Sequence, residues 1–330
     1  MAHELDIMAD GTYSMARASN TDQSWHGLEN VIPDGADFDT WFDRSGMNFT
    51  IHRAPVQFST YLNDDKQLME SKHVLYRSDN LRPLSVVSDN YNIVQPRQVL
   101  EFFRELCSQN GLTMDTAGVI RGGVKFWAMA RTGEQLSIGN NDIVKQYVLL
   151  ATSADYSMAT TAKHTNMRVV CSNTFHASIN NGEAAVKVRH SREFDANAVK
   201  LDLGLMNAEF QSMGYMANEM AKVSLSKLDA ARWFAELLEE RSMDAEEFDD
   251  YINNSRIFKQ FWEGYRRGPG ASETLWGAFN GVTYVIDHIK GRSADTRMNS
   301  AWFGAGATLK EKAWQKALAV INDAQYKVAA

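Results

Sequence analysis

The stretch TMDTAGVIRGGVKFWAMAR, residues 113–131, decides the fold class of this chain. Two runs rich in β-forming residues, Thr113–Ile120 and Val124–Arg131, flank the short segment Arg121–Gly123. Two adjacent glycines accept the positive φ angles of a tight turn, so the stretch predicts a β-hairpin. Ile143–Ala151 reads as a further strong strand. The expected core is therefore an antiparallel sheet.

The residues before this hairpin give further local signals. Phe49–Phe58 predicts a strand, and Val74–Arg77 with Leu84–Val87 predicts a second hairpin. The apolar run after Pro96 has helical spacing, and Pro96 suits the first turn of a helix because its missing N–H has no partner there. Gly111 is expected to end that helix.

The second half of the chain changes character. Arg168–Ile179 indicates a helix and Ala185–Arg189 a strand, and from about Asn197 apolar residues recur at three- and four-residue steps. The sequence therefore predicts an α+β fold with an antiparallel sheet, hairpins and helices in the first ~190 residues, followed by an all-α C-terminal region. We expect an extended N-terminal arm over 1–35, an α+β core domain over 36–195 and a helical region over 196–330.

Composition sets the broad class. Apolar residues make up 44% of the 330 residues and charged residues 23%, which is enough to form a folded core. The two cysteines are too few for a disulfide framework and suggest a reducing compartment. The acidic N-terminus does not resemble a signal peptide, and no apolar run is long enough to span a membrane. We expect a cytoplasmic protein of a bacterial host cell, without membrane contact.

Charge is unevenly distributed along the chain. The net charge is −7, yet residues 121–200 hold ten basic and six acidic side chains. A positive segment inside an acidic chain is often a site for an anionic partner. The alternative is a solvated face that offsets acidic neighbours.

Catalytic signatures are missing from the sequence. It contains no phosphate-binding glycine loop, no zinc-protease motif and no Cys-x-x-Cys pair. Cys107 and Cys171 both lie among apolar residues, which favours buried thiols. We expect no enzymatic activity, no cofactor and no metal, with an unrecognised enzyme using Cys171, His164 or His176 as an open alternative.

The basic middle segment supplies the candidate binding residues. Arginine and lysine pair with phosphates, and aromatic rings stack on bases, so a surface of this kind suits single-stranded nucleic acid. Trp127 could act as such a ring or belong to the core. The candidate nucleic-acid-binding residues are Arg121, Lys125, Trp127, Lys163, His164, Arg168, Lys187, Arg189, His190 and Arg192.

Several motifs carry a family resemblance. They are Tyr91–Pro96 before a helix, Gly122-Gly123 with Trp127 in a hairpin, Asp142–Leu150 in a strand, the segment RVVCSNT at Arg168–Thr174, and Val188–Ser191. With these motifs the chain resembles the phage/plasmid-like proteins grouped as domain of unknown function 932, over roughly residues 20–290. That family is carried by phages, prophages and plasmids, so the resemblance implies a genetic setting more than a reaction.

The order of strands, basic hairpin and trailing helices is also similar to that of the single-strand annealing proteins of phages, of the Erf, RecT and Red-beta type. This second resemblance implies a single-stranded-DNA-binding or annealing protein that acts in recombination or replication without a nucleotide cofactor. It would work as a homo-oligomer, such as a ring, because repeated patches would let an acidic chain present a continuous basic strip. The alternative is a phage or plasmid interaction protein, for example a counter-defence factor, that acts through its acidic surfaces.

Overall fold

Residues 113–131 form the predicted hairpin. In the computed structural model, β6 (Thr113–Ile120) pairs antiparallel with β7 (Lys125–Ile138) on either side of a short helical turn at Arg121–Gly123. The structure describes residues 5–21, 27–61, 63–139, 142–168, 173–175, 185–188, 207–239, 243–267, 273–291 and 294–328.

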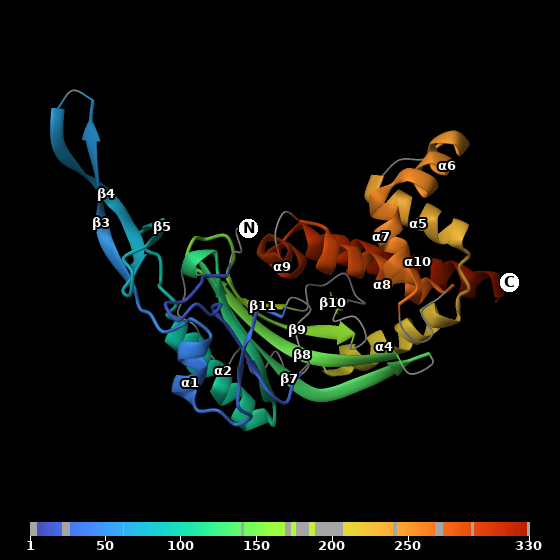
Figure 1. Cartoon of the computed structure of the whole chain (residues 1–330), viewed down its shortest axis with the longest axis horizontal. Coiled ribbons are helices and arrows are strands. Elements are labelled where there is room, and N and C mark those ends of the chain that lie inside the picture. Colours follow the sequence, from blue (N-terminus) through green and yellow to red (C-terminus); the bar gives the residue numbers. More distant parts are fainter. Residues whose placement is uncertain are drawn as a thin grey trace.

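The hairpin lies in the middle of a large sheet with strand order β10-β9-β8-β7-β6-β1-β2, and β11 also pairs with β9 (Figure 1). The other strands of this sheet are β1 (Met15–Ala18), β2 (Asn30–Ile32), β8 (Asp142–Ser153), β9 (Thr160–Arg168), β10 (Asn173–Phe175) and β11 (Ala185–Val188). All pairs are antiparallel except β1 with β2, which is parallel. The segment expected to be an N-terminal arm thus contributes β1, whose four residues are buried, and β2.

Alternate side chains of β7 belong to two different hydrophobic cores. Phe126 and Ala128 point to the face that is covered by α1 (Phe38–Arg44) and α2 (Pro96–Asn110). Trp127 and Met129 point to the opposite face, where a smaller core forms. The alternation follows from strand geometry, in which successive side chains lie on opposite faces.

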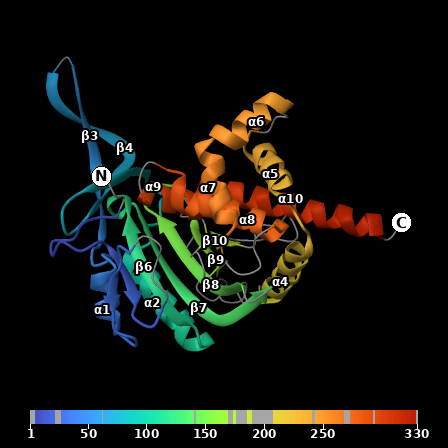
Figure 2. The same cartoon turned by 45° about the vertical axis from the view of Figure 1, so that its right-hand side comes forward.

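A second, three-stranded sheet is built from β3 (Ile51–Thr60), β4 (Asn63–Arg77) and β5 (Pro83–Ser88). Both views show the distal part of the β3–β4 hairpin projecting away from the rest of the molecule (Figures 1 and 2). Its base contacts the core through buried residues such as Ile51 and Leu75.

The described elements after Asn207 are helical. They are α4 (Asn207–Lys222), α5 (Lys227–Glu239), α6 (Ala245–Asn254), α7 (Arg256–Tyr265), α8 (Leu275–Tyr284) with a π-helical end at Val285–Ile289, α9 (Ala294–Phe303) and α10 (Ala305–Val328). Their shared core includes Ile138 of β7 and Val144 of β8, so the helices pack on the far end of the large sheet (Figure 1). Among these described helices none is both long and apolar enough to cross a membrane.

The prediction of a mixed fold with antiparallel sheets and helices is confirmed. The predicted helix at Arg168–Ile179 is wrong in its described part. Arg168 ends β9, and Asn173–Phe175 forms β10, which pairs with β9 at Asn166–Arg168. Cross-strand pairing with the nearby β9 holds Asn173–Phe175 in an extended conformation. The division into three domains stays a prediction.

Candidate functional site

The turn between β6 and β7 allows two arginines from a distant segment to approach its backbone. Arg121, Gly122 and Gly123 have φ angles of 57°, 71° and 96°, a left-handed conformation that favours glycine. A Cβ atom on Gly122 would overlap the guanidinium of Arg82, and one on Gly123 would lie 3.0 Å from Cδ of Arg77. The glycine pair therefore leaves room for both arginine side chains.

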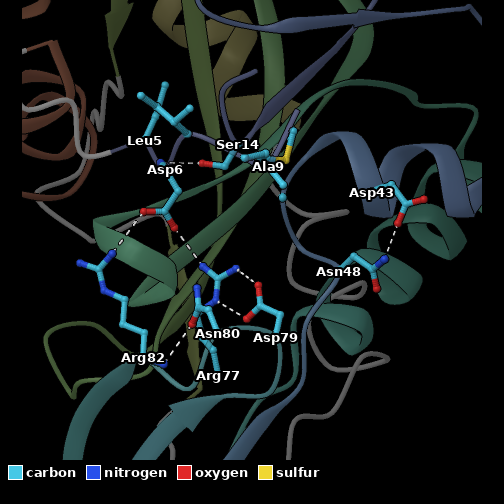
Figure 3. A pocket seen from close by; sticks show the side chains of 13 residues that line it. Leu5, Asp6, Ala9, Ser14, Asp43, Asn48, Arg77, Asp79, Asn80 and Arg82 are labelled. Atoms are coloured by element: carbon cyan, nitrogen blue, oxygen red, sulfur yellow. Dashed lines mark hydrogen bonds and ion pairs between the residues drawn. The ribbon is translucent and has the colours of Figure 1, made fainter. Parts of the chain in front are cut away.

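Arg77 holds this arrangement together from inside (Figure 3). Its side chain is 8% exposed, and it donates to both carboxylate oxygens of Asp79 at 2.9 and 2.6 Å and to Asp6 at 2.9 Å. Partial burial alone would raise the pKa of Asp79, but the hydrogen bonds and charge of Arg77 outweigh it and lower that pKa. Arg77 also lies 4.0 Å above the Phe49 ring. Because the Arg77 guanidinium makes three short charge-assisted hydrogen bonds, its role is structural.

Arg82 and Arg121 are held more loosely. The Arg82 side chain is 54% exposed and lies 3.5 Å from Asp6, and the Arg121 side chain is 41% exposed and lies 3.5 Å from Asp155. Strong charge-assisted hydrogen bonds are shorter, about 2.7–2.9 Å. Two neighbouring guanidiniums thus keep N–H donors that can bind an external anion.

The Arg121 partner is an ionised carboxylate. Partial burial alone would raise the pKa of Asp155, but hydrogen bonds from Ser157 and Ser153 and the charge of Arg121 together lower it. The Asp155 carboxylate therefore orients Arg121 near neutral pH. It does not cover the guanidinium, which stays partly exposed.

A pocket of about 820 Å³ lies beside Arg77 and Arg82 (Figure 3). One wall is the N-terminal segment Leu5–Ala9, and the other includes Arg77, Asp79 and Arg82. Asp6 points from the first wall toward both arginines. Because carboxylates already balance the arginines inside the pocket, an anion is better placed outside it, on the exposed parts of the Arg82 and Arg121 side chains.

An exposed aromatic residue follows the carboxylate that pairs with Arg121. Tyr156 follows Asp155 in the turn between β8 and β9 and is 51% exposed. Its ring meets Tyr91 edge-on at 4.5 Å, and its hydroxyl lies 3.0 Å from that of Ser88. The ring is therefore fixed in place while one part of it faces solvent. We call Arg82, Arg121 and Tyr156 together the turn surface.

Two of the residues predicted from sequence, Lys125 and Lys163, come together against the C-terminal end of α9. Both ammonium groups lie 5.9 Å from the centre of the Phe303 ring, and Lys163 donates to the Trp302 carbonyl at 3.0 Å. Carbonyls at a helix C-terminus attract cations. These lysines therefore help to hold the end of α9 against the sheet.

Trp127 and His164 lie apart from the turn surface. Trp127 is fully buried, and its ring meets Trp302 edge-on at 4.9 Å. A base has no access to it in this structure, so the core interpretation of Trp127 fits and the stacking one does not. His164 is half-buried and lies opposite Val148, one position along β9 from Lys163 and thus on the other face of the sheet.

For two of the remaining candidates, Arg168 and Lys187, the structure describes the position of the backbone. The backbone of Arg168 lies opposite Val144, at the end of β9 that is remote from the β6–β7 turn, and the backbone of Lys187 lies opposite Thr161. Arg189, His190 and Arg192 lie outside the described residues, as do Cys171 and His176. No group of three or more His, Cys, Asp or Glu side chains among the described residues could hold a metal ion.

Sequence reasoning found Arg121 and the glycine pair but missed Arg82, Asp6 and Tyr156. Arg82 and Gly122 are forty positions apart, and no local pattern announces their contact. Positive φ angles at Leu81, Arg121 and Tyr156, one in each of the three neighbouring turns, are visible only in the structure. Such strained backbone often clusters at functional sites.

Comparison with known proteins gives one match. The model of a family described as "Domain of unknown function (DUF932)" matches residues 83–302, two thirds of the chain. The matched part runs from β5 to the end of α9 and includes Arg121 and Tyr156, while Arg82 lies one residue before it. No curated protein and no solved structure matches the chain significantly.

Proposed function

This chain belongs to the family described as Domain of unknown function (DUF932), and we propose that it binds single-stranded DNA through the turn surface. The finer part of the proposal is that it anneals DNA strands as an oligomer, in the recombination or replication of a phage or other mobile element, without a nucleotide cofactor. The family match leaves the activity open, so the proposal depends on the chemistry of the site.

One observation carries the proposal. The Arg82 guanidinium lies against the backbone of Gly122, next to Arg121 in the chain, and the Arg82 and Arg121 side chains are each about half exposed with a carboxylate at 3.5 Å. Two partly exposed guanidiniums that approach the same turn, each with unused donors, suit the repeating phosphates of a nucleic-acid backbone. The exposed arginines Arg97 and Arg267 instead lie 3.0–3.1 Å from a carboxylate one helical turn away, whereas the exposed Arg232 lies 4.0 Å from Asp229.

Tyr156 supports a single strand over a duplex. A base of a single strand can stack on an exposed, fixed aromatic ring, and such stacking is tolerant of sequence. Bases inside a duplex are not available in this way. The turn surface also offers no helix or β-ribbon suited to reading the major groove, so we expect little sequence preference.

The remaining basic candidates have different places in the proposal. Lys125 and Lys163 are assigned to holding α9 because both approach Phe303. Arg168, Lys187, Arg189, His190 and Arg192 stay as candidate contacts along the path of a bound strand. The alternative of an interaction protein that acts through acidic surfaces becomes the leading interpretation if the experiment below finds no binding.

The test replaces both arginines by glutamine in the Arg82→Gln/Arg121→Gln variant and measures binding of a fluorescent oligothymidylate of about 20 nucleotides by anisotropy. Charge-assisted hydrogen bonds contribute about 1.5–3 kcal/mol each, so we expect affinity to fall at least about tenfold. The matched control is Lys222→Gln/Arg232→Gln, which removes two charges from exposed helix positions. It should bind like the wild type.

Three results would contradict the proposal. The first is wild-type affinity in the arginine variant while circular dichroism shows an intact fold. The second is equal loss in the control variant. The third is binding of a duplex of the same length as tightly as the single strand. The annealing part is tested separately, by whether the wild type accelerates pairing of two complementary strands in the absence of nucleotide.

A further inference from the structure

The N-terminal segment of the chain places a carboxylate against one arginine of the turn surface (Figure 3). Asp6 accepts a hydrogen bond from Arg77 at 2.9 Å and lies 3.5 Å from the Arg82 guanidinium. Arg77 also donates to Asp79, whereas the described part of the chain holds no carboxylate besides Asp6 that pairs with Arg82. Asp6 is therefore the counter-ion of Arg82.

Asp6 is fixed in this position by its backbone. Its N–H donates to the Ser14 hydroxyl at 2.9 Å, and its carbonyl accepts from the Ser14 N–H at 2.9 Å. Ser14 is 1% exposed, and the neighbouring Leu5 is 3% exposed and pairs with Ile120 at the end of β6. The Asp6 carboxylate therefore stays beside Arg82 when a ligand approaches from solvent.

Arg82 is positioned by contacts that do not involve Asp6. Its N–H donates to Oδ1 of Asn80 at 3.0 Å, and its carbonyl accepts from the Arg77 N–H at 3.0 Å. Its guanidinium lies against the backbone of Gly122. Removal of the Asp6 charge should therefore leave this arginine in place.

A carboxylate fixed beside Arg82 opposes the binding of phosphate there. The Arg82 side chain is 54% exposed, so a phosphate can reach the guanidinium while Asp6 remains in contact with it. The phosphate then lies near a second negative charge, and the two anions repel each other. The guanidinium also has to share its five N–H donors between them. Asp6 therefore lowers the phosphate affinity of Arg82 without blocking access to it.

We propose that Asp6 is a built-in competitor that limits how tightly the turn surface holds a phosphate. This inference rests on the proposed binding of single-stranded DNA and names a residue that sets its strength. A limited affinity suits an annealing protein, because such a protein has to release the strands once they have paired. Asp6 lies outside residues 83–302, so the competitor belongs to a part of the chain that the family model does not match.

The test replaces Asp6 by asparagine, which removes the charge and keeps an oxygen that can accept from Arg77. Binding of the labelled oligothymidylate is measured by anisotropy at about 150 mM salt, where charges more than about 8 Å away are largely screened. Asp6→Asn should bind about two- to fivefold more tightly than the wild type, as expected for the loss of a partly exposed ion pair. A merely structural role of Asp6 would not raise the affinity.

Two comparisons show whether the gain is local to Arg82. Asp10→Asn removes the same charge from the same segment, but the Asp10 carboxylate pairs with Arg44 at 2.9 Å, so this variant should bind like the wild type. In the Arg82→Gln background, Asp6→Asn should give no gain, because the interaction between the two residues is already lost. An unchanged or weaker affinity of folded Asp6→Asn, or an equal gain in either comparison, would overturn the proposal.

A second measurement follows Arg82 without DNA. Phenylglyoxal modifies arginine side chains, and mass spectrometry of the digested protein reports the rate at each position. Loss of the neighbouring carboxylate frees N–H groups of Arg82 and destabilises its protonated form, so Asp6→Asn should speed the modification of Arg82 and leave that of Arg97 unchanged. Asp6→Ser repeats both measurements if circular dichroism shows that Asp6→Asn has lost its fold. An unchanged rate at Arg82 would overturn the proposal.

Failure of this inference and failure of DNA binding give different results. Wild-type binding that depends on Arg82 and Arg121 but is equally tight in Asp6→Asn overturns the competition alone. Absence of binding by both the wild type and Asp6→Asn overturns the proposed function and the competition together.

Discussion

Gly122 combines a backbone role with a packing role. Its φ of 71° and ψ of 25° suit the turn, and its missing side chain leaves space for the Arg82 guanidinium. The sequence predicts the first role, because adjacent glycines indicate a tight turn. It could not predict the second role, since the approach of Arg82 depends on how the small sheet is placed against the large one.

A matched pair of glycine variants separates these two roles. Gly111, the C-cap of α2, has nearly the same conformation, φ 66° and ψ 23°, but a Cβ there would meet nothing within 4 Å. Gly111→Ala and Gly122→Ala should each lower the free energy of unfolding by about 1–2 kcal/mol, the cost of a left-handed alanine. The Arg82 side chain is flexible and should move aside.

Only Gly122→Ala should weaken binding of single-stranded DNA, because only there does the new methyl group displace an arginine. Urea unfolding and anisotropy of a labelled oligonucleotide measure the two effects. Equal DNA affinity in both variants would contradict the role of Arg82.

At the scale of elements, local signals predict a helix or hairpin correctly where the residues of that one segment determine its conformation. The helix predicted after Pro96 begins at Pro96 and ends with Gly111 in the left-handed C-cap position. The β6–β7 hairpin forms as predicted. The long β4 was not predicted beyond Val74–Arg77 because residues 63–73 are mostly polar and show no alternation, as expected for a ribbon that is solvated on both sides.

The α2 helix offers a pH-dependent test of its packing. Cys107, predicted to be a buried thiol, is 6% exposed, and burial raises its pKa from 9.0 to about 12. The unfolded chain loses this proton near pH 9, whereas the folded protein keeps it, so the folded state binds more protons between these values. The contribution of the Cys107 thiol to the free energy of unfolding is therefore fully present below about pH 9, and it is lost as the pH rises toward 12.

Urea unfolding at pH 8 and pH 10.5 should show a fall in the free energy of unfolding that is smaller in Cys107→Ala than in the wild type. Burial also raises the pKa of Tyr265 to about 12, and that contribution is shared by both proteins. An identical pH dependence in wild type and variant would contradict the buried-thiol interpretation.

At the scale of the whole molecule, the site is a product of long-range assembly. Segments around Asp6, Arg82, Arg121 and Tyr156 meet at one end of the two sheets, although the chain separates them widely. Charge counting along the sequence found the basic middle segment and Arg121 within it. It placed Lys125, Lys163 and Trp127 in the same interface, whereas these side chains pack against the C-terminal end of α9 on one face of the large sheet. Linear patterns show which residues are basic, and the register of the sheet decides which of them share a surface.

The central claim is that phosphates of a single strand bind at Arg82 and Arg121. The measurement that tests it most directly is the salt dependence of oligonucleotide affinity, from about 50 to 200 mM salt, for wild type and for Arg82→Gln/Arg121→Gln. We predict that log affinity falls linearly with log salt for the wild type. The slope of the variant should be flatter by about 1.4, which is about 0.7 for each of the two phosphates that the arginines would neutralise. An absence of binding at about 50 mM salt, or an identical slope in a folded variant, would contradict the claim.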